Sequence, residues 1–286
     1  MKATAIKGAL RALGIGAVLL SAGLVAACGG STTVIRSSGK CKPAPKVEQP
    51  ATQVVDLTHP MQPGMAFWPG GVPFEMTKLV DYDQGYRLHK FSMGENTGTH
   101  LDAPAHFAEG KRTIAQLPAD ELLVDAVVID IKAKVKADPD YRLSANDIDD
   151  WEAGHGEIPF GSLVIANTGW HKRFTEPEKY INQDAEGVMH FPGFGKDAAQ
   201  LLLERDVAGI GIDTLSIDHG PSKGFEAHKV MLGADKYQLE NLANLDALPP
   251  TGARVIIGVL PVVEGTQAQA RVLALVPVKP AETFSD

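Results

Sequence analysis

Short apolar runs rich in β-branched residues recur along the chain and are separated by stretches of mixed polarity. Runs of this length, often flanked by Gly or Pro, are typical of buried β-strands. We therefore predict strands at five places: Ala126–Ile131, Leu163–Asn167, Gly209–Ile212, Ala253–Val259 and Arg271–Val276.

Two of the intervening stretches have the pattern of helices, Ser144–Ala153 and Lys196–Arg205. Ser144 is a suitable N-cap, and Asp147 stands three residues later, where an acidic side chain completes a capping box. The stretch Phe191–Gly195 is expected to form a loop before the second helix. Strands interspersed with helices predict an α/β fold with a mixed sheet.

The first residues have the pattern of an export signal. Lys2, Lys7 and Arg11 precede an apolar run over residues 12–27. The residues around Cys28 resemble the lipobox of bacterial lipoproteins, in which the cysteine is lipidated; a plain signal peptide cut nearby is the alternative. We expect a periplasmic or cell-envelope lipoprotein that meets the membrane through its lipid anchor only.

The rest of the chain divides into a tether and one domain. Residues 28–50 are rich in Ser, Thr, Lys and Pro, which predicts a flexible tether. Neither an internal repeat nor a break in composition follows. Residues 51–286 are therefore expected to form a single domain, whose folded part begins near Val54.

The composition limits the classes of function. Of 286 residues, 44% are hydrophobic and 22% charged, as in proteins with a packed core. The formal net charge of -8 argues against nucleic-acid binding, which needs a basic surface. Cys28 and Cys41 are the only two cysteines, which excludes a disulfide framework and a thiolate zinc site.

Polar residues at alternate positions mark one segment as a candidate metal site. In an extended segment His100 and Asp102 face the same side, and so does Asn96. Pro104 cannot continue a sheet ladder, so the strand is expected to end there and leave His106 in a loop at the rim. A chance His-x-Asp pair without a metal is the alternative.

The chemistry of this segment suits hydrolysis. Imidazole and carboxylate ligands bind zinc, manganese or iron(II). Such an ion polarises a carbonyl group and lowers the pKa of a bound water to about 7. His106 is placed to serve as general base and then as general acid.

A second pair of polar residues lies far along the chain. His228 and Glu240 are separated by a turn around Gly233-Ala234, and apolar residues surround Glu240. A buried carboxylate is costly unless it is paired or binds a metal. The alternative is an exposed Glu240 at the start of a helix.

Together the two clusters resemble the cyclase family of metal-dependent hydrolases, which includes bacterial kynurenine formamidase and isatin hydrolase. The family signature His-x-Gly-Thr-His-x-Asp-x-Pro-x-His is similar to Asn96–His106, and the resemblance spans Val54 to about Val278. Further segments resemble the family: Asp56–Pro60, Trp68–Gly70, Asn167–Trp170, Gly211–Asp218, Glu240–Leu245 and Leu248–Gly252.

The resemblance implies an α/β domain with a mixed, partly barrel-like sheet and flanking helices, assembled as a homodimer or homotetramer with sites near the subunit contacts. It also implies hydrolysis of a small-molecule amide or lactam, with Trp68 as an apolar wall of the substrate pocket. A divalent zinc or manganese ion would be held by four side chains, those of His100, Asp102, His228 and Glu240.

The resemblance further assigns His106 as the general acid/base. Asn96 stands where the signature has its first histidine, and an amide oxygen binds zinc-like ions more weakly than imidazole. It could ligate through oxygen and favour manganese, leave one ion where relatives bind two, or impair the site. We expect an active site with an altered metal preference.

Two other functions compete with this hypothesis. A non-catalytic envelope lipoprotein that binds a metal or small ligand is compatible with Asn96 and the export signal. A serine hydrolase would use Ser222 in Gly220–Gly224, but Glu226 and His228 follow too closely to complete a triad of the usual order.

Overall fold

The computed structural model describes residues 52–278. The chain divides between Glu48 and Gln49 into two units, so every described residue belongs to the second. The predicted signal peptide (1–27), the predicted lipidation of Cys28 and the predicted tether (28–50) lie outside the described residues. Within residues 52–278, no helix is long and apolar enough to cross a membrane.

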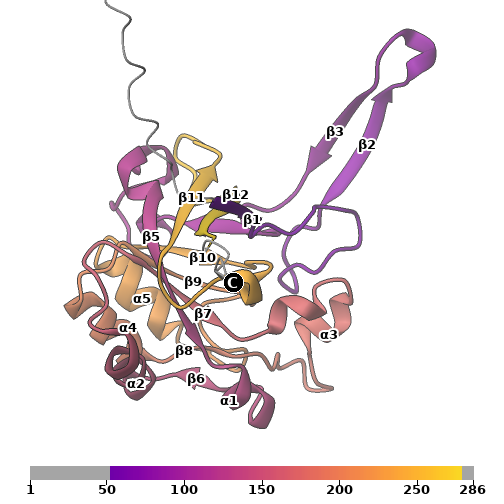
Figure 1. The fold of residues 1–286 in the computed structure, drawn as a ribbon. Helices are drawn as coiled ribbons and strands as arrows, with labels where there is room; N and C mark the ends of the chain where they lie inside the picture. The colour runs from indigo at the N-terminus through magenta and orange to yellow at the C-terminus, as the bar shows by residue number, and fades with distance from the viewer. Residues whose placement is uncertain (1–51, 279–286) are drawn as a thin grey trace, which may run out of the picture. The chain divides into compact units, whose positions relative to one another are not determined.

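Seven strands close into a ring at the centre of the domain (Figure 1). Their order is β12-β11-β5-β7-β9-β10-β4, and β4 pairs back with β12; β1 extends the sheet along the rest of β12. The β5-β7, β7-β9 and β9-β10 pairs are parallel and the other pairs are antiparallel. This arrangement confirms the predicted mixed, partly barrel-like sheet. The strands are β1 Thr52–Asp56, β4 His100–Asp102, β5 Leu123–Asp130, β7 Leu163–Asn167, β9 Gly209–Ile212, β10 Tyr237–Glu240, β11 Ala253–Val259 and β12 Gln267–Pro277.

Two hydrophobic cores lie on opposite faces of this sheet. In β7, Leu163 and Ile165 join the core that the ring encloses, whereas Val164 and Ala166 pack in the core beneath the helices. Alternate residues of a strand face opposite sides, so a strand buried on both faces is apolar throughout. This is why β7 and β9 could be recognised as continuous apolar runs.

A layer formed by α2, α4 and α5 covers the outer face of the parallel strands, and α1 and α3 are short helices in the connections (Figure 1). The helices are α1 Lys132–Ala137, α2 Ala145–His155, α3 Pro177–Ile181, α4 Lys196–Glu204 and α5 Glu226–Gly233. The predicted cap of α2 is confirmed, because Ser144 and Asp147 form a reciprocal capping box. Short 3-10 turns connect the elements: η1 Tyr82–Gln84, η2 Pro104–His106, η3 Ile114–Gln116, η4 Ala119–Leu122, η5 Trp170–Arg173 and η6 Leu245–Ala247.

The prediction of strand bounds is correct for β7, β9 and β11 and too short for two others. Strand β5 starts before the predicted Ala126, and β12 starts before the predicted Arg271. Phe191–Gly195 is not wholly a loop, because β8 (Gly193–Phe194) pairs in it with β6 (Arg142–Leu143). Such two-residue strands are too short to leave a periodic pattern in the sequence.

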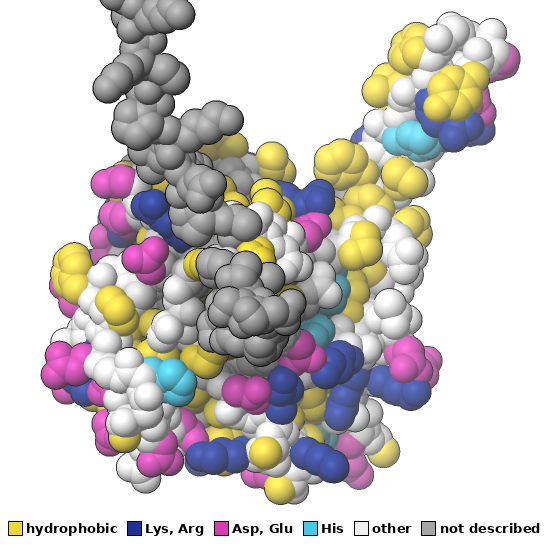
Figure 2. Space-filling view, in the orientation of Figure 1, with side chains coloured by type: hydrophobic (Ala, Val, Ile, Leu, Met, Phe, Trp, Pro, Cys, Tyr) yellow, Lys and Arg dark blue, Asp and Glu magenta, His cyan; other side chains and the backbone are white. Residues whose placement is uncertain are grey.

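A two-stranded ribbon leaves the barrel as an arm (Figure 1). It consists of β2 (Glu75–Val80) and β3 (Leu88–Ser92), which form a two-stranded sheet of their own. Apolar side chains are exposed along it, as Figure 2 shows. Met76 and Phe91, which face each other across the two strands, are 50% and 58% exposed.

His59 packs the segment after β1 against the domain. Its ring stacks on Phe174 with centroids 3.6 Å apart, and its backbone N–H donates to Thr99 Oγ1 at 3.0 Å. Burial lowers the pKa of His59 to about 4; the nearby charge of His171 lowers the pKa further, and Asp213 opposes this. The ring is therefore neutral in the folded protein at pH 7.

We predict that His59 makes the domain sensitive to acid. The unfolded chain binds a proton at this residue with a pKa near 6.5, whereas the folded chain does so only near 4. The unfolded state thus holds more protons between these values, so its stabilisation grows as pH falls from 6.5 towards 4. The free energy of unfolding should drop by about 2 kcal/mol between pH 7.5 and pH 5 on this account.

Denaturant unfolding of the metal-free protein at the two pH values measures this drop. His59→Phe keeps an aromatic ring on Phe174 but cannot take a proton, so its loss of stability should be smaller by that amount. An equal drop in the variant and the natural protein would show that His59 is not responsible.

Candidate metal centre

Strand pairing brings three of the predicted ligands to one face of the sheet. His100 lies opposite Glu240 in the register of β4 and β10, and Asp102 follows His100 by two residues. Leu101 and Leu239 point into the core that the ring encloses. Because strand residues alternate between faces, the three polar side chains point outward, towards α5.

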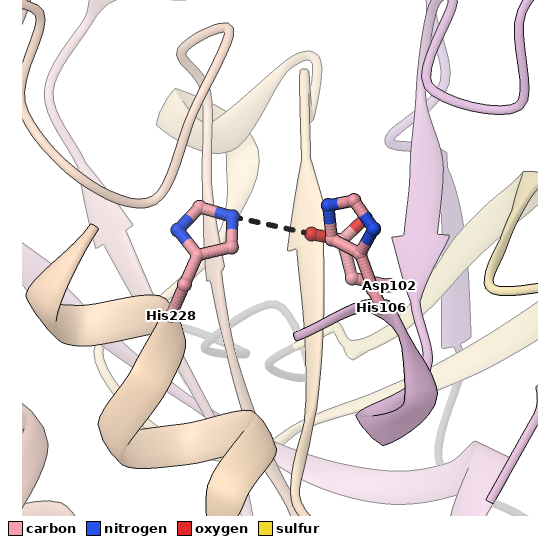
Figure 3. Close-up of side chains that lie close together, drawn as sticks. All are labelled: Asp102, His106 and His228. Atoms are coloured by element: carbon pink, nitrogen blue, oxygen red, sulfur yellow. Dashed lines mark ion pairs between the residues drawn. The ribbon is translucent and has the colours of Figure 1, made fainter. Parts of the chain in front are cut away.

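Helix α5 supplies the fourth residue, His228. Figure 3 shows its ring facing Asp102, with His106 beside Asp102. Asp218 holds this part of the helix, because its carboxylate accepts hydrogen bonds from the backbone N–H groups of Ala227 and His228 at 3.0 and 3.2 Å. An acidic side chain at the N-terminus of a helix satisfies N–H groups that lack helical partners.

Nitrogen and oxygen atoms of four side chains converge at short range in this cluster. His100 Nε2 lies 3.2 Å from Asp102 Oδ1 and 3.3 Å from Glu240 Oε2. His228 Nε2 lies 3.4 Å from Asp102 Oδ2 and 3.2 Å from Glu240 Oε1. All four residues are buried. The structure thus brings together the four predicted ligands from two distant parts of the chain.

Hydrogen bonds orient both imidazole rings. Nδ1 of His100 lies 2.8 Å from the carbonyl oxygen of Gly98, and Nδ1 of His228 lies 2.6 Å from Asp218 Oδ2. A proton on Nδ1 satisfies each contact and leaves the lone pair of Nε2 directed at the cluster. Such outer hydrogen bonds are characteristic of histidines that bind metals.

The buried carboxylates of the cluster strongly favour positive charge beside them. Burial alone would lower the pKa of His100, but hydrogen bonds and charge from Asp102 and Glu240 outweigh burial and raise it to about 10. The pKa of His228 is raised well above its ordinary value, since Asp102, Asp218 and Glu240 likewise outweigh its burial. A divalent cation supplies the same charge when it displaces protons from such ligands.

The residues present fit a small divalent ion. Asp102 Oδ2 is buried and has no hydrogen-bond partner among the described residues, although it lies beside His228 Nε2. Leaving a buried oxygen without a partner is costly. Ligand atoms at about 2.0–2.1 Å from zinc in a tetrahedron are about 3.3 Å apart, which agrees with the spacing of this cluster.

His106 stands at the edge of the cluster, on η2. Strand β4 ends at Asp102 and Pro104 begins this 3-10 turn, as the sequence predicted for the end of the strand. The His106 ring lies with its centroid 6.2 Å from that of His228. Burial lowers the pKa of His106, with opposing charge from Asp102, so the neutral ring is favoured at pH 7.

An aromatic-walled cavity of about 240 Å³ opens over the cluster, and His106, His228 and Glu240 line it. Trp68 lies in its wall, with its ring centroid 6.3 Å from that of Phe225. Phe107 lies in the wall as well, and its ring centroid is 5.6 Å from that of Phe225. These rings form an apolar surface beside the polar floor, which suits a flat organic molecule.

Asn96 also lines this cavity, but not from a strand. The prediction of one extended segment from Asn96 to Asp102 is wrong, because β4 begins only at His100 and Gly98 has a φ of +78°. Among the described residues, no hydrogen bond joins the Asn96 side chain to the four predicted ligands.

Sequence reasoning missed two residues that contact the cluster. Gln267 donates from Nε2 to Asp102 Oδ1 at 2.8 Å, and Asp218 orients His228. Asp218 could have been found from the sequence, since it belongs to a segment that resembles the family. Gln267 could not, because a single glutamine has no pattern that marks it. The alternative of an exposed Glu240 on a helix is wrong, because Glu240 ends β10 and is 4% exposed.

Four other histidines make their contacts apart from the cluster. His59 and His171 line a separate cavity, and His171 bonds the buried Asp213 at 2.8 Å. His190 bonds Asp140 and Asp184, while His155 stacks on Trp151. Ser222 accepts the backbone N–H of Phe225 in a turn that no strand precedes directly, so the strand-turn-helix context of a serine nucleophile is absent there.

Known proteins resemble the chain over most of this domain. The family model described as "Putative cyclase" matches residues 55–219. An isatin hydrolase of Roseibium aggregatum is 36% identical over 214 residues, which cover 71% of this chain and 81% of the relative. A kynurenine formamidase of Erythrobacter litoralis is 24% identical over 223 residues, covering 77% and 93%.

Solved structures of proteins with similar names also superpose on this chain. The isatin hydrolase A of Labrenzia aggregata, bound to benzyl benzoate, superposes with a TM-score of 0.76 at 34% identity, covering 79% of this chain and 94% of that one. A potential metal-dependent hydrolase with cyclase activity superposes with a TM-score of 0.61 at 25% identity, covering 80% and 100%. From the matched residues and the shared fold, the chain belongs to the cyclase family of metal-dependent hydrolases.

Proposed function

We propose that this hydrolase opens the amide bond of a small aromatic substrate, either a lactam fused to a ring or an N-acylated aromatic amine. The observation that carries the proposal is the convergence of His100, Asp102, His228 and Glu240 beneath an aromatic-walled cavity, with His106 at its edge. Relatives named isatin hydrolase and kynurenine formamidase support the choice of an amide bond.

The cavity orients the substrate in this proposal. Trp68, Phe107 and Phe225 offer faces and edges of aromatic rings on which the substrate ring packs. The substrate carbonyl then lies towards the polar floor that includes Glu240 and His228. The cavity volume of about 240 Å³ suits a molecule of one or two rings better than a peptide.

His106 moves the protons. Its neutral ring accepts a proton from the attacking water at an imidazole nitrogen, and it then donates this proton to the leaving nitrogen. Burial keeps the ring neutral before the reaction, because it lowers the pKa of His106. The divalent ion, when bound, supplies Lewis acidity that polarises the carbonyl and acidifies the water.

We propose zinc or manganese as the ion. Two imidazoles and two carboxylates form a mixed ligand set that suits both metals. Asn96 lines the same cavity and offers an amide oxygen, a harder ligand than imidazole. This difference from the family signature favours manganese relative to proteins that have a histidine at this position.

We further propose that two copies of the chain associate through the β2-β3 arm. An isolated two-stranded ribbon is only marginally stable in water, and large apolar side chains are exposed along this one. Met76 and Phe91 form an exposed apolar pair near its base. The arm starts between Trp68 and Asn96, so a partner on it would lie near the cavity.

The reaction is tested first with the purified protein and its metal content. We expect hydrolysis of isatin-like lactams or N-formyl aromatic amines, followed by absorbance, that disappears after chelation and returns on addition of Zn²⁺ or Mn²⁺. Metal-loaded protein that turns over neither class of amide nor simple esters would support the non-catalytic alternative instead.

His106→Ala should lower kcat by about 10²–10⁴-fold while the bound metal is unchanged, because the proton acceptor is lost but the four ligands remain. Steady-state kinetics and metal quantification on the same sample provide the test. His155→Ala is the matched control, since His155 stacks on Trp151 away from the cavity and should leave kcat unchanged. Near-full turnover of the His106 variant with intact metal would refute its role.

Sedimentation at micromolar concentration tests the arm. The natural domain should sediment as a dimer or larger assembly, and Phe91→Glu should shift it towards monomer, because a charge in an apolar contact is costly. Phe160→Glu is the control, since Phe160 is 80% exposed but lies outside the arm. A natural domain that sediments as monomer would contradict the proposal.

A further inference from the structure

Two buried glutamines flank Asp102, one from each neighbouring strand. Gln238 of β10 and Gln267 of β12 are both Cα partners of Asp102 in β4. Directly opposed residues of antiparallel strands share a face, so both amide side chains start next to the carboxylate. They are 0% and 7% exposed.

The two glutamines differ in what they contact. Gln267 Nε2 donates to Asp102 Oδ1 at 2.8 Å and lies 3.5 Å from His100 Nε2. Neither amide atom of Gln238 has a hydrogen-bond partner among the described residues. The chain thus contains one glutamine that holds the carboxylate and one at the equivalent position that does not.

The bond from Gln267 makes the two oxygens of Asp102 unequal. Oδ1 is occupied by an N–H donor, whereas Oδ2 has no hydrogen bond and lies 3.4 Å from His228 Nε2. A carboxylate is free to bind a cation through one oxygen or both. Catalytic metal sites must keep a position open for water, which a second carboxylate oxygen would fill.

We propose that Gln267 is a positioning residue of the metal centre, which holds Asp102 so that it binds the ion through one oxygen and leaves a position open. This inference rests on the proposed function, because it requires a metal at the cluster. Gln267 acts through Asp102, as outer hydrogen-bonding partners of metal ligands do. Gln238 has the same register but no such role.

Metal affinity in a competition titration with a chromophoric chelator tests the inference. Gln267→Leu removes the donor and should weaken Zn²⁺ binding by about 10–100-fold. Gln238→Leu is the matched control, and it should leave the affinity unchanged because its amide bonds no ligand. Equal affinity of Gln267→Leu and the natural protein would overturn the inference, whereas a natural protein that binds no Zn²⁺ or Mn²⁺ would overturn the proposed function itself.

A second readout separates positioning from a general loss of structure. The visible absorption of Co²⁺-substituted protein weakens as the coordination number rises, so it should weaken in Gln267→Leu and stay unchanged in Gln238→Leu. Thermal unfolding of both metal-free variants checks that they fold. An unchanged Co²⁺ spectrum in folded Gln267→Leu would contradict the positioning role.

Gln267→Glu distinguishes a donor from a direct ligand and keeps the size of the side chain. If the amide N–H holds Asp102, the new carboxylate repels Oδ1, and Zn²⁺ affinity should fall at least as far as in Gln267→Leu. Affinity equal to or higher than that of the natural protein would mean that position 267 binds the ion through oxygen, which would overturn the proposal.

Discussion

The pairing of β4 with both β10 and β12 is the constraint on which the structure depends. This three-residue strand closes the barrel, and the same backbone hydrogen bonds place two carboxylates and one imidazole together, to which α5 adds His228. Burying Asp102 and Glu240 at 0% and 4% exposure is costly unless positive charge compensates them. The pairing of β4 therefore both closes the barrel and buries the carboxylates that a cation would neutralise.

The cluster is assembled from rigid elements and held by a surrounding set of polar bonds. The backbone N–H of Ile217 donates to Glu240 Oε1 at 2.8 Å, and Asp218 both caps α5 and orients His228. Gly98 accepts from the His100 ring and from the Asn241 amide. Each ligand thus has a partner outside the cluster, which limits its motion before an ion binds.

In the proposed function, the aromatic wall binds the substrate and the polar floor carries the reaction. Trp68, Phe107 and Phe225 come from three separate loops or turns, while the ligands come from strands and a helix. Loops on a rigid scaffold are where binding surfaces vary most readily. This separation allows the wall of the cavity to change while the cluster stays the same.

The sequence by itself determined the strands whose pattern of apolar residues follows directly from packing against the cores. The strands β7, β9 and β11 were predicted with their full bounds because their apolar residues face two cores or alternate between core and solvent. Strand β10 was not predicted, and β4 only as part of a longer extended segment, since the polar residues that face the cluster interrupt the apolar pattern.

The spacing of His100 and Asp102 was enough to place them on one face, because alternation is a local property of a strand. Their meeting with His228 and Glu240 and the hydrogen bond of Gln267 to Asp102 depend on strand register and on the placement of α5. Only the tertiary structure decided these, because contacts between residues more than a hundred positions apart are set by the closure of the whole sheet and leave no periodic signal in the chain.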